Sequence, residues 1–123
     1  MVELIWEQSG VFRRMTGHVT LEELDSSASQ LQGNARVDDL RYIIHDFSGA
    51  TDVVVSQGDI EFMAVRASIA LLKNPKVKIA FVGGHPVVHA MIDAFNNLGA
   101  SPNRCHRFDT LEEARRFAAP QSP

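Results

Sequence analysis

The chain has 123 residues, of which 45% are hydrophobic and 22% are charged, and its formal net charge is −3. This composition is typical of one soluble globular domain and excludes a disordered chain. The negative charge argues against a general nucleic-acid binder, which needs a basic stripe for the phosphates, so no nucleic-acid partner is expected. Basic residues occur as small pairs, Arg13-Arg14 and Arg115-Arg116, which we interpret as solvated faces.

The first third of the sequence predicts a β-hairpin followed by a helix. Residues 2–8 alternate apolar and polar side chains, residues 11–16 form a second short run, and a Ser-Gly turn signal separates them. Thr20 and Glu23 have the spacing of a capping box, in which each side chain satisfies a free backbone donor of the other residue. We therefore expect a helix from this point to about Gln32.

The middle of the chain is its most informative part. Residues 41–47 predict a strand that is covered on both faces, because its centre is apolar without alternation. A short turn with Ser48 and Gly49 is expected next, followed by a helix over residues 57–73. In open α/β sheets, ligands bind where the carboxyl end of a strand leads into a helix amino terminus.

The last third predicts two further strand-helix steps. A buried strand is expected over residues 77–82, and Pro86 suits the first turn of the next helix because its missing amide donor would be unpaired there. That helix is expected to end by Gly99. A last strand near residues 104–108 then leads to Thr110, which begins a second capping box and a final helix.

The predicted fold class is α/β, with the element order ββαβαβαβα. Strands that alternate with helices favour right-handed crossovers and a largely parallel sheet. The initial hairpin must add an antiparallel pair, so the sheet is mixed. We predict a single domain over residues 1–119 and a frayed tail over residues 120–123.

This element order, together with the sequence of residues 40–51 before a helix, resembles the STAS domain. More narrowly, the chain is similar to the SpoIIAA-like STAS/SEC14 proteins of bacteria. Residues 17–24 look like that group's approach to its first helix, and residues 108–114 look like its closing strand-to-helix step. The resemblance spans nearly the whole chain. It implies a mixed, mostly parallel sheet with an N-terminal hairpin and four helices.

The resemblance also implies a regulatory site at the start of the second predicted helix. In anti-sigma-factor antagonists of this superfamily, a phosphorylatable serine follows an aspartate there. Ser56 stands at roughly the corresponding place, although Val55 replaces the acid. Ser56, with Gly58 in the same turn and Ser48 nearby, is therefore a candidate phospho-switch or anion contact. The alternative is that Ser56 is an N-cap, paired with Asp59.

A second candidate site is the turn Gly83-Gly84-His85. Paired glycines let a backbone approach a ligand closely, but the turn lacks the lysine and the spacing of a phosphate loop. A plain tight turn is the alternative, and the favoured, explanation. His85, His89 and Asp93 follow one helix edge, yet no glutamate accompanies them as in zinc hydrolases. We interpret these histidines as capping or surface residues, and predict no metal, cofactor or catalytic site.

Further sequence features exclude other classes of site and of protein. The single cysteine, Cys105, excludes an internal disulfide framework and all-cysteine zinc sites. No basic segment followed by an apolar run begins the sequence, and no window approaches the roughly 18 apolar residues of a membrane span. We therefore expect a cytoplasmic protein without a membrane span.

His45 and Asp46 are adjacent in a strand, so their side chains point to opposite faces of the sheet and do not form a catalytic dyad.

The second predicted helix is apolar on two faces. Ile60, Met63 and Ala64 begin one apolar face, as a surface helix requires. Four more apolar side chains gather on nearly the opposite face: Phe62, Val65, Ile69 and Leu72. This second face must contact either the neighbouring helix of the domain or something outside it, namely a protein partner, a second subunit or an apolar ligand.

These observations favour a non-catalytic STAS-like regulatory or interaction module, which binds a protein partner or self-associates through the second helix. Its working surface is expected to combine the first part of that helix with the turn over residues 83–85. The alternative is a protein that binds a small ligand or lipid, as the SEC14 side of the resemblance implies. An apolar cavity beside the second helix would favour that alternative. An enzyme that uses His85 and His89 is a third reading and requires convergent imidazoles.

Overall fold

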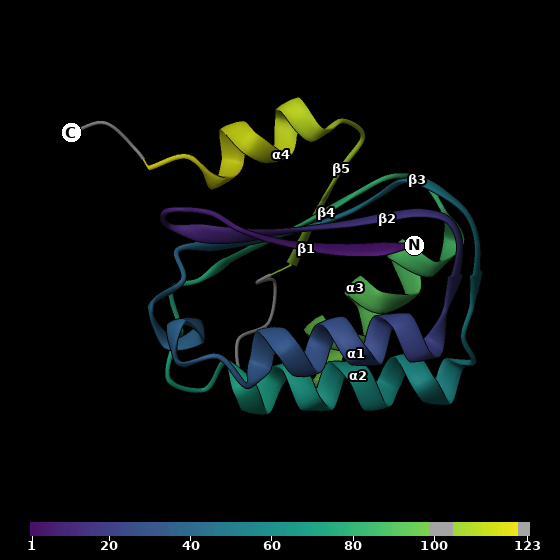
Figure 1. Ribbon diagram of the computed structural model, residues 1–123, viewed down its shortest axis with the longest axis horizontal. Coiled ribbons are helices and arrows are strands. Elements are labelled where there is room, and N and C mark those ends of the chain that lie inside the picture. The colour runs from purple at the N-terminus through teal and green to yellow at the C-terminus, as the bar shows by residue number, and fades with distance from the viewer. Residues whose placement is uncertain (99–104, 121–123) are drawn as a thin grey trace.

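The computed structural model describes residues 1–98 and 105–120, which form a sheet covered by helices on both faces (Figure 1). The elements, in chain order, are β1 (Val2–Trp6), β2 (Gly10–Thr20), α1 (Leu21–Gln32), η1 (Ala35–Asp39), β3 (Tyr42–Val54), α2 (Gln57–Ala70), β4 (Lys78–Val82), α3 (Pro86–Leu98), β5 (Cys105–Phe108) and α4 (Leu111–Ala118). The predicted order ββαβαβαβα is confirmed, and the short 3-10 helix η1 is added between α1 and β3.

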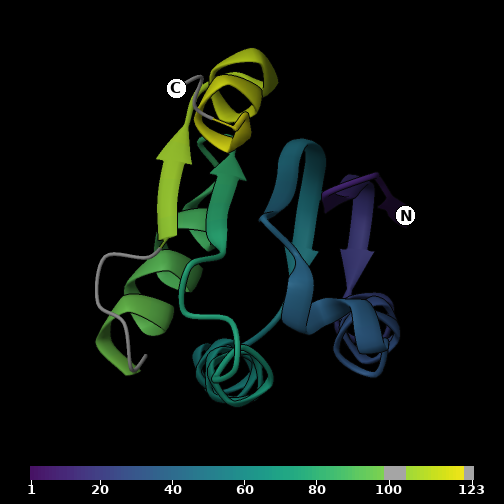
Figure 2. The same ribbon diagram turned by 90° about the vertical axis from the view of Figure 1, so that its left-hand side faces the viewer.

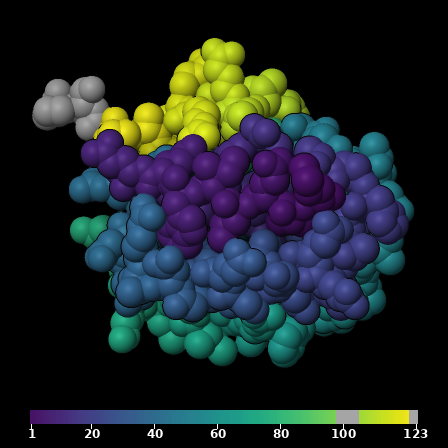
Figure 3. Space-filling view, in the orientation of Figure 1, coloured from purple at the N-terminus to yellow at the C-terminus, as the bar shows by residue number. Residues whose placement is uncertain are grey.

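Within the described residues the strands form one five-stranded sheet in the order β1-β2-β3-β4-β5. β1 and β2 are antiparallel, whereas β2, β3, β4 and β5 run parallel to one another. The mixed, mostly parallel sheet with an N-terminal hairpin is therefore confirmed. Figure 3 shows this hairpin on the molecular surface, between α4 on one side and α1 and α2 on the other.

The helices divide unequally between the two faces of the sheet. α1, α2 and α3 pack on one face, and α4 packs on the other, as Figures 1 and 2 show. Each right-handed crossover moves one strand further in the same direction, so the three crossover helices fall on the same face. The larger core lies beneath them. A smaller core under α4 consists of Phe12, Ile44, Ala80, Val82, Ala114 and Ala118.

The predicted turn at Ser48 and Gly49 is wrong, because β3 continues as a strand to Val54. β3 pairs with β4 from Tyr42 to Asp46, but it pairs with the long strand β2 as far as Val54, through two register shifts. A Cβ on Gly49 would lie 3.1 Å from the Thr16 side chain, so the glycine allows this close pairing. The ladder with β2 outweighs the local turn preference of serine and glycine.

The helix starts follow the predicted capping chemistry. Thr20, Ser56 and Thr110 each form a complete capping box with the acidic residue three positions later. α2 ends at Ala70, three residues before the predicted end. The predicted helix end at Gly99, the start of the last strand at residue 104 and residues 121–123 of the predicted tail lie outside the described residues.

Candidate functional site

The Gly83–His85 turn lies against the backbone of β3. Gly83 has a φ of 120°, which residues other than glycine rarely adopt. A Cβ at this position would lie 3.3 Å from the Phe47 carbonyl carbon and from the Ser48 nitrogen. The amide of Gly83 donates to the carbonyl of Phe108 at 3.0 Å. Gly84 has open space around it. The turn therefore needs a glycine at position 83 for conformation and for close packing.

Ser48 is an exposed strand residue, and its hydroxyl is engaged by a carboxylate. Its Oγ donates to Oδ1 of Asp46 at 2.6 Å, and its amide donates to the same oxygen at 2.9 Å. Asp46 is buried on the α4 side of the strand, with 6% of its surface exposed. A phosphate on Ser48 would place negative charge beside this carboxylate. The geometry therefore disfavours Ser48 as an anion contact.

His85 makes a local bond at the start of α3. Its Nδ1 accepts a hydrogen bond from the amide of Val87 at 3.1 Å, whereas His89 is exposed one turn later. In residues 1–98 and 105–120, no three His, Cys, Asp or Glu side chains are placed to hold a metal ion. The hydrogen bond from the Val87 amide agrees with the interpretation of His85 as a residue that caps the start of α3.

Ser56 is the N-cap of α2. Its Oγ accepts a hydrogen bond from the amide of Asp59 at 3.0 Å, and the Asp59 carboxylate accepts one from the Ser56 amide at 2.9 Å. Both Ser56 and Gly58 are exposed. The hydroxyl is accessible for modification, but a phosphate there would compete with the Asp59 carboxylate for the amides of the first turn.

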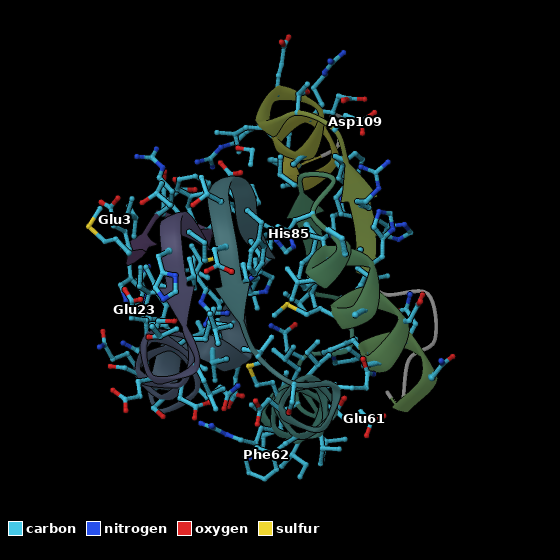
Figure 4. All side chains as sticks on the ribbon, turned by 90° about the vertical axis from the view of Figure 1, so that its right-hand side faces the viewer. Glu3, Glu23, Glu61, Phe62, His85 and Asp109 are labelled. Carbon is cyan, nitrogen blue, oxygen red and sulfur yellow. The ribbon has the colours of Figure 1, made fainter. Side chains whose placement is uncertain are left out.

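The structure does not bring Ser56 to the rim formed by Ser48 and the Gly83–His85 turn. The strand residues 49–54 lie between the two serines, and at roughly 3.3 Å per residue they account for about 20 Å of chain. The single working surface expected from the first part of the helix and the turn stays a prediction, which this separation along β3 does not favour. Figure 4 likewise shows His85 beside the sheet and Phe62 on the far side of α2.

The second apolar face of α2 is exposed. The exposed fractions of Phe62, Val65, Ile69 and Leu72 are 61%, 42%, 63% and 62%; the first three belong to α2, and Leu72 lies in the turn just after it. The neighbouring α1 contacts α2 at its edge, where Arg66 donates to Asp25 at 3.3 Å and to Ser29 at 3.1 Å. Of the two alternatives for this face, a covering helix of the same domain is wrong. The face is free to contact something outside the domain.

The opposite face of α2 lines an apolar cavity of about 90 Å³. The cavity lies between the sheet and the three helices of the larger core, and Met63, Ala64 and Ala67 form part of its wall. Arg13 and His45 also reach it from β2 and β3. An apolar cavity in this position is the observation that favours the small-ligand alternative.

The interpretation of Arg13 as a solvated residue is wrong, since 8% of its surface is exposed. Its Nε donates to Oγ of Ser27 at 2.8 Å, and its Nη2 donates to the carbonyl of Leu24 at 2.7 Å. Burial lowers the pKa of Arg13 to about 10, while the charge of Asp25 acts in the opposite direction. Strand alternation could have revealed this residue, because it places Arg13 between the buried side chains of Val11 and Met15.

His45 and Asp46 point to opposite faces, as predicted for adjacent strand residues. Burial, assisted by the positive charge of Arg13, lowers the pKa of His45 to about 3, so the imidazole is neutral near pH 7. Its ring lies 4.6 Å from the ring of Phe81. Its Nδ1 is inaccessible to solvent and has no hydrogen-bond partner among the described residues. Buried polar atoms without a partner are uncommon in folded proteins.

Comparison with known proteins identifies the fold through structure alone. No protein-family model matches the sequence, and neither does any curated protein. The anti-sigma factor antagonist SpoIIAA in its unphosphorylated form is 11% identical, with a TM-score of 0.64 over 95% of this chain and 96% of that chain. The phosphorylated form of SpoIIAA, a Bacillus cell fate determinant, is 16% identical, with a TM-score of 0.67 over 97% and 100%.

A third similar structure is an uncharacterised DUF3478-family protein from Shewanella loihica with a SpoIIAA-like fold. It is 12% identical, with a TM-score of 0.54 over 97% of this chain and 93% of that chain. These matches cover almost the whole length of each protein, which agrees with the resemblance carried by the sequence. The chain therefore has the SpoIIAA-like fold of the STAS domain.

Proposed function

We propose that this chain is a non-catalytic regulatory module that associates through the exposed face of α2. The occupant of that face is the same helix of a second copy of the chain. The observation that carries the proposal is the exposure of Phe62, Val65 and Ile69 along one side of α2, continued by Leu72 in the turn that follows the helix. The fold supports a regulatory role by analogy, because the similar structure SpoIIAA is an anti-sigma factor antagonist.

The spacing of the four apolar residues suits helix-helix packing. They follow one another at intervals of three, four and three residues, which is the spacing of the a and d positions of a coiled coil. Such a seam fits the groove of a facing helix and requires little curvature over three turns. A helical occupant therefore fits this face better than an extended peptide does.

The pattern is also self-complementary. An antiparallel register centred on residue 67 places Phe62 opposite Leu72 and Val65 opposite Ile69 of the second copy. The same register places the exposed Glu61 opposite Lys73. In a two-fold interface every contact occurs twice, once from each copy of the chain. The residues that pair across the interface must therefore be reciprocal in this way. Charge complementarity at the two ends would fix the antiparallel direction.

Residues at the start of α2 could regulate this association. Ser56 and Gly58 begin the same helix and are exposed. We propose Ser56 as a phosphorylation or anion site that would act by adding negative charge at the acidic end of the docking face. The Gly83–His85 turn packs on β3 and is not part of this face.

Sedimentation equilibrium from micromolar to millimolar concentration tests the proposal. Wild-type protein should approach the dimer mass, whereas Ile69→Glu and Val65→Glu should remain monomeric because each places two charges in the apolar seam. Ile5→Glu is the matched control, since Ile5 is an exposed apolar residue of β1 and should leave the dimer intact.

A charge exchange tests the register. Glu61→Lys should weaken the dimer by placing two lysines opposite each other, and adding Lys73→Glu should restore it. A wild-type protein that stays monomeric at millimolar concentration would contradict self-association. Equal weakening by the single and the double exchange would contradict the antiparallel register.

A further inference from the structure

The cavity beneath α2 combines an apolar wall with buried polar groups. Its apolar lining includes Leu31 of α1, Met63 of α2, Phe95 of α3 and Ile43 of β3. Its lining side chains with polar groups are Arg13, Gln32, His45 and Arg66. A volume of about 90 Å³ is several times the roughly 10–15 Å³ that one water molecule needs, and less than the roughly 150 Å³ of a cavity known to bind benzene. The space therefore suits a small organic group.

Arg13 brings a positive charge to this cavity without a carboxylate to balance it. Its two hydrogen bonds go to the neutral groups Ser27 Oγ and Leu24 C=O. A guanidinium has five N–H donors, so three of them have no partner among the described residues. Asp25 is the acid whose charge acts on Arg13, but its carboxylate is 3.3 Å from Arg66 instead. Buried charges in proteins are normally paired.

His45 adds a neutral hydrogen-bonding group to the same cavity. Its Nδ1 has no partner, and a neutral imidazole can place its proton on either nitrogen. Next to an anion, the tautomer with a proton on Nδ1 would be favoured, because it turns this atom into a donor. The cavity therefore contains one unbalanced positive charge and one neutral donor, both largely removed from water.

We propose that this cavity binds a small apolar carboxylic acid, with the carboxylate on Arg13 and Nδ1 of His45 and the hydrocarbon group against α2. A carboxylate matches the donors of a guanidinium and supplies the single negative charge that Arg13 lacks. A phosphate would bring more negative charge than one buried cation balances. The hydrocarbon group would take the place of water against Met63 and Leu31. This site does not depend on the exposed face of α2.

Nuclear magnetic resonance of protein labelled on its methionine methyl groups would detect the ligand directly. Of the four methionines, Met63 and Met91 line the cavity, whereas Met1 and Met15 do not. Titration with acetate, butyrate and hexanoate should shift the first pair of methyl signals and leave the second pair unchanged. Between acetate and butyrate, each added methylene should tighten binding about fourfold, until the cavity is full.

Control compounds test the assignment of charge. Hexylamine and hexanol have the same number of carbon atoms as hexanoate without the negative charge, and inorganic phosphate carries negative charge without a hydrocarbon chain. None of the three should shift Met63 and Met91 at the concentrations at which hexanoate does. Shifts by hexanol equal to those by hexanoate, or displacement of hexanoate by phosphate, would overturn the proposed carboxylate site.

A pair of arginine variants tests the residue that carries the charge. Arg13→Leu should weaken butyrate binding by about tenfold or more, because it removes a charged hydrogen-bonding partner. Arg14→Leu is the matched control: Arg14 is adjacent on β2, but it is exposed and lies over the Phe12 ring on the opposite face of the sheet. Equal affinity in Arg13→Leu and wild type would overturn the proposal.

A measurement on the wild-type protein keeps the test decisive if Arg13→Leu does not fold. Nuclear Overhauser contacts should join the butyrate methyl group to the methyl group of Met63. His45→Phe should weaken butyrate binding severalfold, since it removes the second donor and keeps the ring. Contacts to Met1 or Met15 in place of Met63, or no contacts with saturating butyrate, would place the ligand elsewhere and contradict the proposal.

Discussion

The carboxylate of Glu7, just after β1, accepts two hydrogen bonds from the guanidinium of Arg115 in α4, at 2.5 and 2.8 Å. The hydroxyl of Tyr42 donates to the same carboxylate. Among the described residues, α4 is the one helix on its face of the sheet, so this ion pair joins the last helix to the N-terminal hairpin. Bidentate pairs of this kind are stronger than ordinary surface ion pairs.

Glu7→Gln should therefore destabilise the protein by about 1 kcal/mol at pH 7. The Arg115 hydrogen bonds hold the pKa of Glu7 below its ordinary value of 4.5, and burial opposes them. A carboxyl whose pKa is lowered by folding stabilises the native state above its unfolded pKa, and this contribution is lost as the pH falls through the folded pKa. Urea denaturation from pH 7 to pH 3 should show a smaller loss for Glu7→Gln than for wild type below pH 4.5. An identical loss in both proteins would contradict the pairing.

His45 should control stability in a higher pH range. The folded protein binds a proton at His45 only near pH 3, whereas the unfolded chain binds one near pH 6.5. The unfolded state therefore holds more protons between these values, and stability decreases as the pH falls below 6.5. His45→Leu should flatten the dependence between pH 6.5 and 4.5, whereas Glu7→Gln should leave it unchanged. Denaturant midpoints measured across this range would test it, and an unchanged slope in His45→Leu would refute it.

Gly83→Ala should destabilise the protein by about 2 kcal/mol, because a φ of 120° is strained for alanine. The added Cβ would also lie 3.3 Å from the backbone of Phe47 and Ser48. Gly84→Ala is the matched control, since a Cβ at Gly84 has no atom within 4 Å, and it should change stability by less than about 0.5 kcal/mol. Urea denaturation of both variants measures the difference. Equal effects would show that the turn imposes no conformational requirement at position 83.

Ser56→Ala should cost about 1 kcal/mol, because it removes the acceptor for the Asp59 amide at the start of α2. Ser56→Asp should retain most of the stability, since aspartate is an equally good N-cap. Ser26→Ala, at an exposed position inside α1, controls for helix propensity and should be neutral or slightly stabilising. Thermal denaturation compares the three variants. If Ser56→Ala is as stable as wild type, the cap contributes nothing and the exposed hydroxyl needs another explanation.

The fold could be predicted from the sequence because its signals are local. Capping residues, breakers and apolar patterns fix where each helix begins, and alternation of helices with strands fixes the parallel sheet. The length of β3 could not be predicted in this way, since residues 49–54 are held by pairing with a strand 33 or 34 residues earlier in the chain. Residues Ser48 and Gly49 prefer turns only in the absence of such a partner.

The candidate site was predicted in part. The exposed face of α2 follows from helical periodicity, which needs no knowledge of neighbouring elements. The cavity with Arg13 could not be located, because it is formed by three helices and three strands that meet only in the folded chain. Arginine is rarely buried, so composition favours a solvated interpretation, and strand alternation is the stronger local guide.

The side chain of Asn74, four residues after the end of α2, is a buried hydrogen-bond donor. It is 8% exposed, and its Nδ2 donates to the carbonyls of Val37 and Leu40 at 3.1 and 2.8 Å. These bonds join the end of α2 to η1. Asn74→Ala would leave two buried carbonyls without this donor and should cost about 2–3 kcal/mol in urea denaturation.

Asn74→Asp should make stability depend on pH in the opposite direction from Glu7. A carboxylate would face two carbonyl oxygens in a buried position, so burial and repulsion would raise its pKa. A group whose pKa is raised by folding stabilises the native state below its unfolded pKa, here roughly 3.9, and the contribution is lost as the pH rises through the folded pKa. Asn97→Asp, at an exposed position of α3, is the control. If both variants lose the same stability between pH 4 and pH 7, the Asn74 side chain does not hold the two carbonyls in solution.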